Sequence, residues 1–284
     1  MSQFISQYFD INFMADHFST VFTAFVTLTL ELFLISGILS LIWGLILSLL
    51  RQVPGKLGAP VRFLSIAYID VFRGIPLLLV ILLIYGGFGA LSSSNATPGP
   101  LPEFIAVPTF FGKPSAFWYG VFAITITYGA YMAEVYRAGI ESVPRGQMEA
   151  ARSLGMSHAQ AMRYVIVPQA VRTVIPPLLN DLVALMKDTS LVSIISLPEA
   201  VQVSFDIQSN TFNSSALTLA AFMYLVVTLP MARLVDWLIH RQQKRTQRGP
   251  ATGDEGGVPP GLAQSVPAAG GGVGARGATG MPGV

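Results

Sequence analysis

The feature that most constrains this chain is a set of five apolar stretches, each long enough to cross a lipid bilayer as a helix. A helix needs about 20 mostly apolar residues to span roughly 30 Å of hydrocarbon. Of the 284 residues, 52% are hydrophobic and only 11% are charged, whereas about 25% of residues are charged in soluble domains. The sequence therefore predicts an all-α membrane protein with five transmembrane helices, over residues 20–50, 65–91, 117–138, 170–195 and 216–239.

The positive charges of the chain gather in alternate loops. Lys and Arg occur in residues 51–62, in residues 137–172 and after residue 240. The other loops hold only Lys113, and the first twenty residues have no Lys or Arg, so they lack the basic region of a cleaved signal peptide. Because cytoplasmic loops carry the excess of Lys and Arg, we expect the N-terminus outside and the C-terminus in the cytoplasm.

The ends of the chain differ from the apolar middle. Residues 1–19 form the expected extracytoplasmic segment, and residues 20–240 the expected transmembrane domain. Residues 241–284 begin with basic residues and continue mostly as Gly, Pro, Ala and Val, a composition that cannot bury enough surface to offset chain entropy. We expect a disordered cytoplasmic tail. The chain has no cysteine and three scattered histidines, so no metal site is predicted.

The longest inside loop, residues 141–168, carries helix signals. Pro144 suits a first helical position, and Gly155 suits the left-handed residue that follows a helix. Ser157 and Gln160 have the spacing of a capping box. The second helix is expected to end before Pro168, which disfavours helical backbone at the residue ahead of it.

The expected result is two short helices joined at a glycine, between two membrane spans. Such a rigid element can fit a groove on a soluble partner and move with it. Its spacing fits equally well an ordinary pair of surface helices, so the residues alone leave both interpretations open.

The loop pattern resembles a known family. Glu149-Ala150-Ala151 followed by Gly155 and then Ile166-Val167-Pro168 is similar to the EAA loop of ATP-binding-cassette (ABC) importer permeases. The resemblance covers roughly residues 20–240 and implies the type I importer permease fold, although Glu31 departs from the family pattern. The motifs at residues 72–78, 129–134, 143–147, 168–170 and 187–191 resemble the polar amino-acid uptake branch. The residues implied to contact an ATPase are Glu149, Ala150, Ala151, Gly155 and Pro168.

The resemblance also implies a division of labour in a bacterial cytoplasmic membrane. Permeases of this family bind no ATP themselves, and the chain has no Gly-x-x-x-x-Gly-Lys-Ser/Thr phosphate loop. Two ATP-binding subunits, which hold ATP and Mg, would lie beneath two permease subunits. The second permease would be the same chain or a paralogue. A separate solute-binding protein would deliver a polar amino acid. The chain itself would be a lipid-embedded transporter subunit with no enzymatic activity, no cofactor and no nucleic-acid partner.

Polar residues inside the predicted fourth span follow one helical face. Opposite charges there suit the ammonium and carboxylate of an amino acid. The alternative is an internal salt-bridge network, with Lys187 and Asp188 close enough to the outer surface for their charged ends to reach it. Pro176-Pro177, just before this polar face, are expected to break the helix, a feature often found near transporter sites. The candidate residues of this face are Asn180, Asp181, Lys187 and Asp188.

Two further charges lie in predicted spans. Arg73 is followed by Gly74 and Pro76, which predict a helix interruption, and a guanidinium there suits a substrate carboxylate. The alternative for Arg73 is a structural bridge to Glu134 or Asp70. Glu134 lies near the inside boundary, so a structural or gating role competes with substrate contact.

Other classes of membrane protein fit less well. An intramembrane hydrolase needs a nucleophile with its base or a metal set, and the sequence has neither a cysteine nor a His-Glu-x-x-His motif. A self-contained carrier usually has internal repeats, and none is evident. Co-purification of an ATPase would distinguish an importer permease from both classes.

Overall fold

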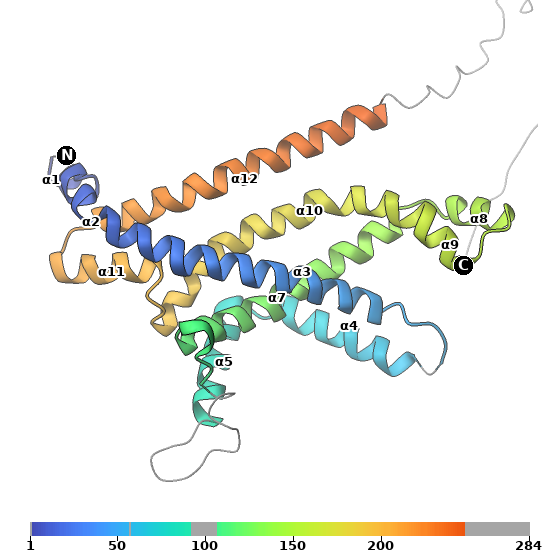
Figure 1. Cartoon of the computed structure of the whole chain (residues 1–284), viewed down its shortest axis with the longest axis horizontal. Helices are drawn as coiled ribbons and strands as arrows, with labels where there is room; N and C mark the ends of the chain where they lie inside the picture. Colours follow the sequence, from blue (N-terminus) through green and yellow to red (C-terminus); the bar gives the residue numbers. More distant parts are fainter. Residues whose placement is uncertain (1, 57, 92–106, 248–284) are drawn as a thin grey trace, which may run out of the picture. The chain divides into compact units, whose positions relative to one another are not determined.

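The computed structural model describes residues 2–56, 58–91 and 107–247 (Figure 1). Residues 1–241 form one compact unit, to which the following paragraphs refer. All regular elements in the described ranges are helical. They are α1 (Ser2–Tyr8), α2 (Ile11–Ala24), α3 (Glu31–Leu50), α4 (Ala59–Gly74), α5 (Leu77–Leu91), α7 (Ser115–Glu141), α8 (Arg145–Ser153), α9 (His158–Ala161), α10 (Val167–Asp188), α11 (Ala200–Thr211) and α12 (Ser215–Gln247), with π-helical turns at Phe25–Leu30 and Met162–Ile166 and 3-10 turns at Phe110–Gly112 and Thr189–Ile195.

The first predicted span lies in a longer helical run. Helices α2 and α3 join through the π-helical turn Phe25–Leu30, so the chain is helical from Ile11 to Leu50. Within the π-helical turn, the carbonyl of Thr27 accepts a hydrogen bond from the Lys113 ammonium at 2.7 Å. Lys113 also pairs with Glu31 at 2.6 Å. The single basic residue of the predicted outside loop thus holds that loop against the first span.

The second predicted span is not one straight helix. Helices α4 and α5 are bent by 107° at the break between them. Ile75 has the extended backbone angles φ −96° and ψ 130°, as the residue before a proline prefers. The interruption predicted at Gly74 and Pro76 is therefore present, and residues 65–91, predicted as one span, form two helices.

Helix α7 lies at the centre of the unit and contacts α3, α4, α5 and α10. Small residues allow the close approach of α3. A side chain on Gly44 would lie 2.8 Å from Cβ of Met132, and one on Gly129 would lie 2.6 Å from the Trp43 ring. Glycine pairs of this kind let helix backbones pack closely in membranes.

The outer face of α3 is apolar and unpacked. Large side chains along it are exposed while the opposite side is buried against α7. In water such a surface would be a strong aggregation site, whereas in a bilayer it faces lipid tails. The exposed residues are Leu34, Ile38, Ile42, Leu45 and Leu49.

Two described helices pass a length and hydropathy test for a membrane span, Phe4–Leu50 and Ser215–Arg241, and the bent pair α4–α5 is a third candidate. Helices α7 and α10 overlap the predicted spans 117–138 and 170–195 but are more polar. The segment between the predicted fourth and fifth spans contains α11, which the sequence did not indicate. Most of the predicted tail and part of the loop after α5 lie outside the described residues.

Helix α10 contains Pro176 and Pro177 within a continuous helix. The predicted break at these residues is wrong. Val174 and Leu178, on either side of the pair in sequence, are buried in the main hydrophobic cluster, and Pro176 is also buried. Packing against the surrounding helices keeps α10 regular despite the missing backbone donors.

Candidate functional site

The predicted loop helix is α8, which begins after Pro144. Pro144 is the N-cap residue rather than the first helical residue, one position earlier than expected. Gly155 has φ +84°, so the left-handed conformation predicted for it is confirmed. Its N–H donates to the carbonyl of Arg152 at 3.0 Å, and the N–H of Met156 donates to that of Ala151 at 3.2 Å. This pair of bonds is a Schellman motif, which satisfies the last carbonyls of the helix.

The second loop helix starts with the predicted capping box. The Ser157 hydroxyl accepts from the N–H of Gln160 at 3.2 Å, and the Gln160 side chain accepts from the N–H of Ser157 at 2.8 Å. The predicted end before Pro168 is wrong. Helix α9 continues through the π-helical turn Met162–Ile166 into α10, with Pro168 in the first turn of α10.

The π-helical turn explains how Pro168 is accommodated. The N–H of Val167 donates to the carbonyl of Met162, five residues back, instead of four. The regular α-helical hydrogen bonding is already interrupted at this turn. The missing N–H of Pro168 therefore costs no further α-helical hydrogen bond. As a result one uninterrupted helical run extends from His158 to Asp188 (Figure 1). A displacement of α8 can pass through the Gly155 turn directly into α10.

The surface of the loop differs from the sequence motif. Glu149, Ala150 and Gly155 are exposed, but Ala151 is only 4% exposed because it packs inside the chain. Leu154 is 81% exposed beside the turn. Sequence reasoning missed Leu154 as a surface residue of the loop. The available signal was a large apolar residue within a charged loop.

Glu134 lies in an ion-pair network at the inner end of α7. Its carboxylate pairs with Arg51 from the end of α3 at 2.7 Å and with Arg137 one turn along α7. Arg137 also pairs with Glu141. This network ties α3 to α7 immediately before the loop, a geometry that suits a structural or gating role.

Arg73 lies at the end of α4 and pairs with neither Glu134 nor Asp70 within the described part of the chain, so the predicted structural bridge is not formed. Its guanidinium lies over the Tyr131 ring, 5.8 Å from the centroid. The Tyr131 hydroxyl donates to the Arg73 carbonyl at 3.3 Å. Arg73 is exposed, and its guanidinium makes no hydrogen bond or ion pair with the described residues.

Asp181 and Asp188 of α10 lie on the same side as Arg73. Tyr128, whose ring centroid is 5.9 Å from that of Tyr131, donates its hydroxyl hydrogen to Asp188 at 2.8 Å. Asp181 is within electrostatic reach of Arg73, and its buried Oδ2 atom has no hydrogen-bond partner among the described residues. The structure thus links Arg73 to Asp188 through Tyr131 and Tyr128, which sequence reasoning did not connect, and Asp181 lies within electrostatic reach of Arg73.

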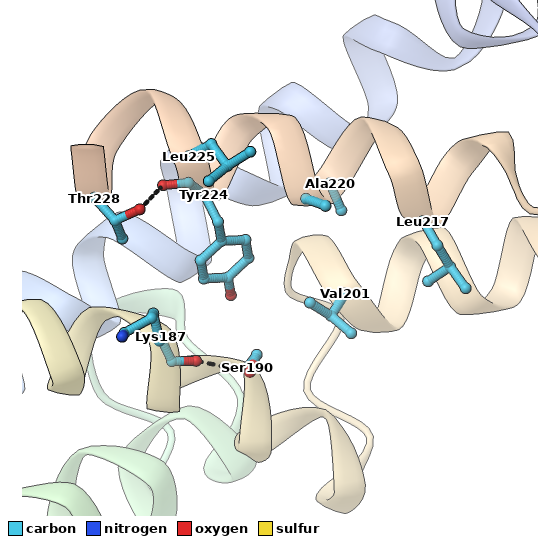
Figure 2. A pocket seen from close by; sticks show the side chains of 9 residues that line it. Lys187, Ser190, Val201, Leu217, Ala220, Tyr224, Leu225 and Thr228 are labelled. Carbon is cyan, nitrogen blue, oxygen red and sulfur yellow. Dashed lines mark hydrogen bonds between the residues drawn. The ribbon is translucent and has the colours of Figure 1, made fainter. Parts of the chain in front are cut away.

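Asn180 and Lys187 are exposed and do not join this cluster. Lys187 lines a separate groove between α10, α11 and α12, shown in Figure 2. The polar face of the fourth predicted span is therefore divided between two sites, and the expected meeting of Lys187 and Asp188 at one site is not seen.

Glu199 is a buried acid that sequence reasoning missed. It caps α11 by accepting from the N–H groups of Val201 and Gln202. The Thr29 and Tyr224 hydroxyls donate to it, each at 3.2 Å, from the first span and from α12. Glu199 lies between the predicted fourth and fifth spans, and its burial raises the pKa of its carboxyl. The available signal was the position of Glu199, directly after Pro198 in a loop without basic residues.

Comparison with known proteins assigns the family. The model of the family described as "Binding-protein-dependent transport system inner membrane component" matches residues 40–246. The chain belongs to this family. The matched residues include α8, Gly155 and all of α10. The loop described above therefore lies within the part of this inner membrane component that the family model covers.

Relatives of this inner membrane component are similar over most of their length. The probable glutamine ABC transporter permease protein GlnM of Bacillus subtilis (strain 168) is 32% identical over 83% of this chain and 99% of its own. The glutamate/aspartate import permease protein GltK of Escherichia coli O157:H7 is 32% identical over 76% of this chain and 91% of its own. In a crystal structure of an amino acid ABC transporter with histidines, one chain matches with a TM-score of 0.68 and 34% identity, over 80% of this chain and 96% of that chain. The fold is the all-helical type I ABC permease fold.

Proposed function

We propose that this inner membrane component is the permease subunit of an ABC importer for a polar amino acid. The observation that carries the proposal is the continuous connection from α8 through the capped Gly155 turn into α10. A surface helix joined rigidly to a membrane helix can transmit the movement of a soluble motor. The relatives GlnM and GltK, named for glutamine and for glutamate and aspartate, support the amino-acid class.

The proposed topology has five spans, with the N-terminus outside and the C-terminus in the cytoplasm. The bent pair α4–α5 counts as one span. The distribution of Lys and Arg supports this orientation, because α8 and its basic residues fall on the positive side. Helices α7 and α10 would cross in spite of their polarity, because neighbouring helices and a second permease subunit would cover their polar faces.

The proposed partners on the cytoplasmic side are two ATP-binding subunits, which carry ATP and Mg. The exposed part of the loop, with Glu149, Ala150 and Leu154, would contact one of them. Gly155 and Pro168 position this surface, and Ala151 packs beneath it. An extracytoplasmic binding protein would deliver the amino acid.

A second permease subunit, either the same chain or a paralogue, would cover the polar surface. Arg73, Asn180 and Lys187 are exposed in residues 1–241 alone. A charged side chain in the bilayer centre costs about 2.5–3.5 kcal/mol on insertion scales. These side chains would therefore face a second subunit and the route between the two, together with Asp181 and Asp188.

Transport then follows from a shift between two states. Nucleotide binds more tightly to the closed form of the ATP-binding pair, and this differential affinity shifts the permease with it. Movement of α8 turns α10, which carries Asp181 and Asp188 past Arg73 on α4. Glu134 and its arginines hold α3 and α7 together at the inner end.

The test uses Gly155→Val, with Gly112→Val as its matched control. Both glycines have positive φ and nothing within 4 Å of an added Cβ, so the substitutions introduce similar strain, on the order of 1–2 kcal/mol. Gly155→Val is expected to reduce ATPase co-purification or amino-acid uptake at least tenfold, with normal membrane insertion. Gly112→Val is expected to keep both. Normal coupling in Gly155→Val, or absence of any co-purified ATPase from the unmodified complex, would contradict the proposed function.

A further inference from the structure

Glu199 is fully buried and belongs neither to the loop around Gly155 nor to the cluster around Arg73. It follows α10 in the chain, after the 3-10 turn Thr189–Ile195 and residues 196–198. Among the described residues no basic side chain pairs with it, so hydrogen bonds alone satisfy its carboxyl oxygens. An apolar side chain would fill this space at a lower desolvation cost. The carboxyl therefore indicates a need for directional contacts.

The hydrogen bonds of Glu199 join three parts of the fold. At the start of α11, the N–H groups of Val201 and Gln202 donate to its Oε1, each at 2.9 Å. The Thr29 hydroxyl, from the first helical run, and the Tyr224 hydroxyl, from α12, donate to its Oε2, each at 3.2 Å. Figure 2 shows the Tyr224 ring pointing from α12 toward the end of α10. Fully satisfied buried networks of this kind specify one arrangement of the elements they join.

Two buried threonines extend this network. The Thr29 hydroxyl oxygen also accepts from the N–H of Ala200 at 3.2 Å, so the first helical run contacts both the side chain of Glu199 and the backbone after it. Thr189, the first residue of the 3-10 turn, donates to the carbonyl of Met186 at 2.7 Å, and its oxygen lies 3.4 Å from the Tyr224 hydroxyl. The end of α10 is thereby fixed against α12 and the first run.

This fixed end of α10 lies opposite α8. The helical run from His158 to Asp188 is about 45 Å long at 1.5 Å per residue, and Figure 1 shows α8 near one end of it and α11 near the other. A rod held at one end rotates about that end when its other end is displaced. A rod held at neither end can instead slide along its axis.

We propose that Glu199 is a positioning residue for transport, which holds the end of α10 to the first helical run and to α12. A displacement of α8 is then converted into rotation of α10 about that end. This inference rests on the proposed import function. Glu199 acts through the helices that it joins, because its side chain is buried away from any route that a substrate could take.

The test measures amino-acid import per ATP hydrolysed by the complete complex, reconstituted in liposomes with its ATP-binding subunits and binding protein. Thr29→Val combined with Tyr224→Phe removes both long-range donors to Glu199, nearly preserves side-chain size and keeps the N–H bonds from α11. ATP hydrolysis should continue in this double variant, while import per ATP falls by about tenfold or more. Glu199→Gln keeps a carbonyl acceptor and should retain most of the wild-type ratio.

The matched control is Tyr68→Phe, which removes a hydroxyl that joins helices elsewhere. That hydroxyl accepts from the Trp43 indole N–H and donates to the carbonyl of Ile126, each at 2.9 Å. It ties α4 to α3 and α7 without contacting α10, so the ratio of import to ATP hydrolysis should stay at the wild-type value.

Spin-label distances in the otherwise wild-type complex give a second measurement, with labelled copies diluted by unlabelled ones. A pair at Ile194 and Val226, both exposed, lies near the fixed end of α10. Its distance should be the same with and without a non-hydrolysable ATP analogue. A pair at Tyr164 and Leu234, also exposed, lies toward the other end, and its distance should change.

Three outcomes would overturn the inference. One is a wild-type ratio of import to ATP hydrolysis in the double variant. Another is a proportional fall of both rates, or loss of assembly, in the double variant and in Glu199→Gln, which makes the network purely structural. The third is a nucleotide-dependent change in the distance from Ile194 to Val226. Each of these refutes the role of Glu199 alone, whereas a wild-type complex that imports no amino acid refutes the import function itself.

Discussion

The α4–α5 run and the α9–α10 run both contain proline, and they differ in shape. The run formed by α4 and α5 bends by 107° at Gly74 and Pro76. The run from α9 to α10 contains Pro168, Pro176 and Pro177 and stays helical throughout. Proline alone therefore does not decide where the chain turns.

The bend has local causes. An added Cβ on Gly74 would meet nothing within 4 Å. At the end of α4, the N–H of Ile75 donates to the carbonyl of Val71 at 3.1 Å. At the start of α5, the carbonyl of Pro76 accepts from the N–H of Leu79 at 2.9 Å. Backbone groups at both helix ends therefore have hydrogen-bond partners, and the break leaves few of them unpaired.

In α10 the neighbours hold the helix straight. Helix α7 approaches it so closely that a Cβ on Gly139 would lie 2.0 Å from Cγ1 of Val174. Val174 is two residues before Pro176, and both are buried. Tertiary packing compensates there for the backbone bonds that the prolines remove.

The largest expected effect comes from breaking this contact. Gly139→Val places atoms where Val174 already lies, and overpacking of this kind costs about 3 kcal/mol or more when the backbone cannot move. We expect loss of the assembled complex or a fall of many degrees in the apparent Tm of the purified permease. Gly74→Ala, with free space around it, should change the Tm little.

A rescue makes this prediction specific. Val174→Ala removes the two methyl groups nearest the new side chain, so Gly139→Ala combined with Val174→Ala should recover much of the stability that Gly139→Ala loses. Independent, additive losses in the double variant would show that the α7–α10 contact does not hold α10 straight.

The parts of the fold that sequence reasoning predicted depend on neighbours along the chain. Gly155, the Ser157–Gln160 capping box and the break before Pro76 all follow from local backbone chemistry. The regularity of α10 does not, because it depends on α7. The same is true of Glu199, which accepts from Thr29 at a separation of 170 residues.

The candidate site divides in the same way. Helical spacing placed Asp181, Lys187 and Asp188 on one polar face, but spacing cannot say which neighbours the face meets. The contact of Tyr128 with Asp188 and the groove beside Lys187 follow from how α7 and α12 pack on α10. Sequence alone therefore found the polar helix but not its two separate surroundings.

Proline replacements compare the two runs directly. Pro76→Ala lets Ile75 adopt helical angles, so we expect the α4–α5 bend to vary. Pro176→Ala with Pro177→Ala restores two backbone donors in a helix that is already straight, and should raise stability by about 1–3 kcal/mol without changing its shape.

Spin-label distances measure both effects, since the chain has no cysteine to compete for the labels. One pair at Phe63 and Leu83 crosses the bend, and another at Tyr164 and Ile194 spans α10; all four side chains are exposed. Pro76→Ala should broaden the first distance distribution, and the double replacement should leave the second unchanged. An unchanged first distribution would mean that contacts elsewhere fix the bend.

The smallest expected effect concerns a turn without proline. At Gly155 the chain turns between two helix ends that are fully capped, and Ser157→Ala removes the hydroxyl that accepts from Gln160. The cap contributes about 1 kcal/mol, and its site is exposed, so membrane insertion and overall assembly should be normal. Faster amide hydrogen exchange is expected in residues 158–162, with Ser153→Ala as a control on the preceding helix. If residues 158–162 exchange equally slowly in Ser157→Ala and Ser153→Ala, the hydrogen bonds at Gly155 hold α9 in place as α8 moves, and the capping box does not.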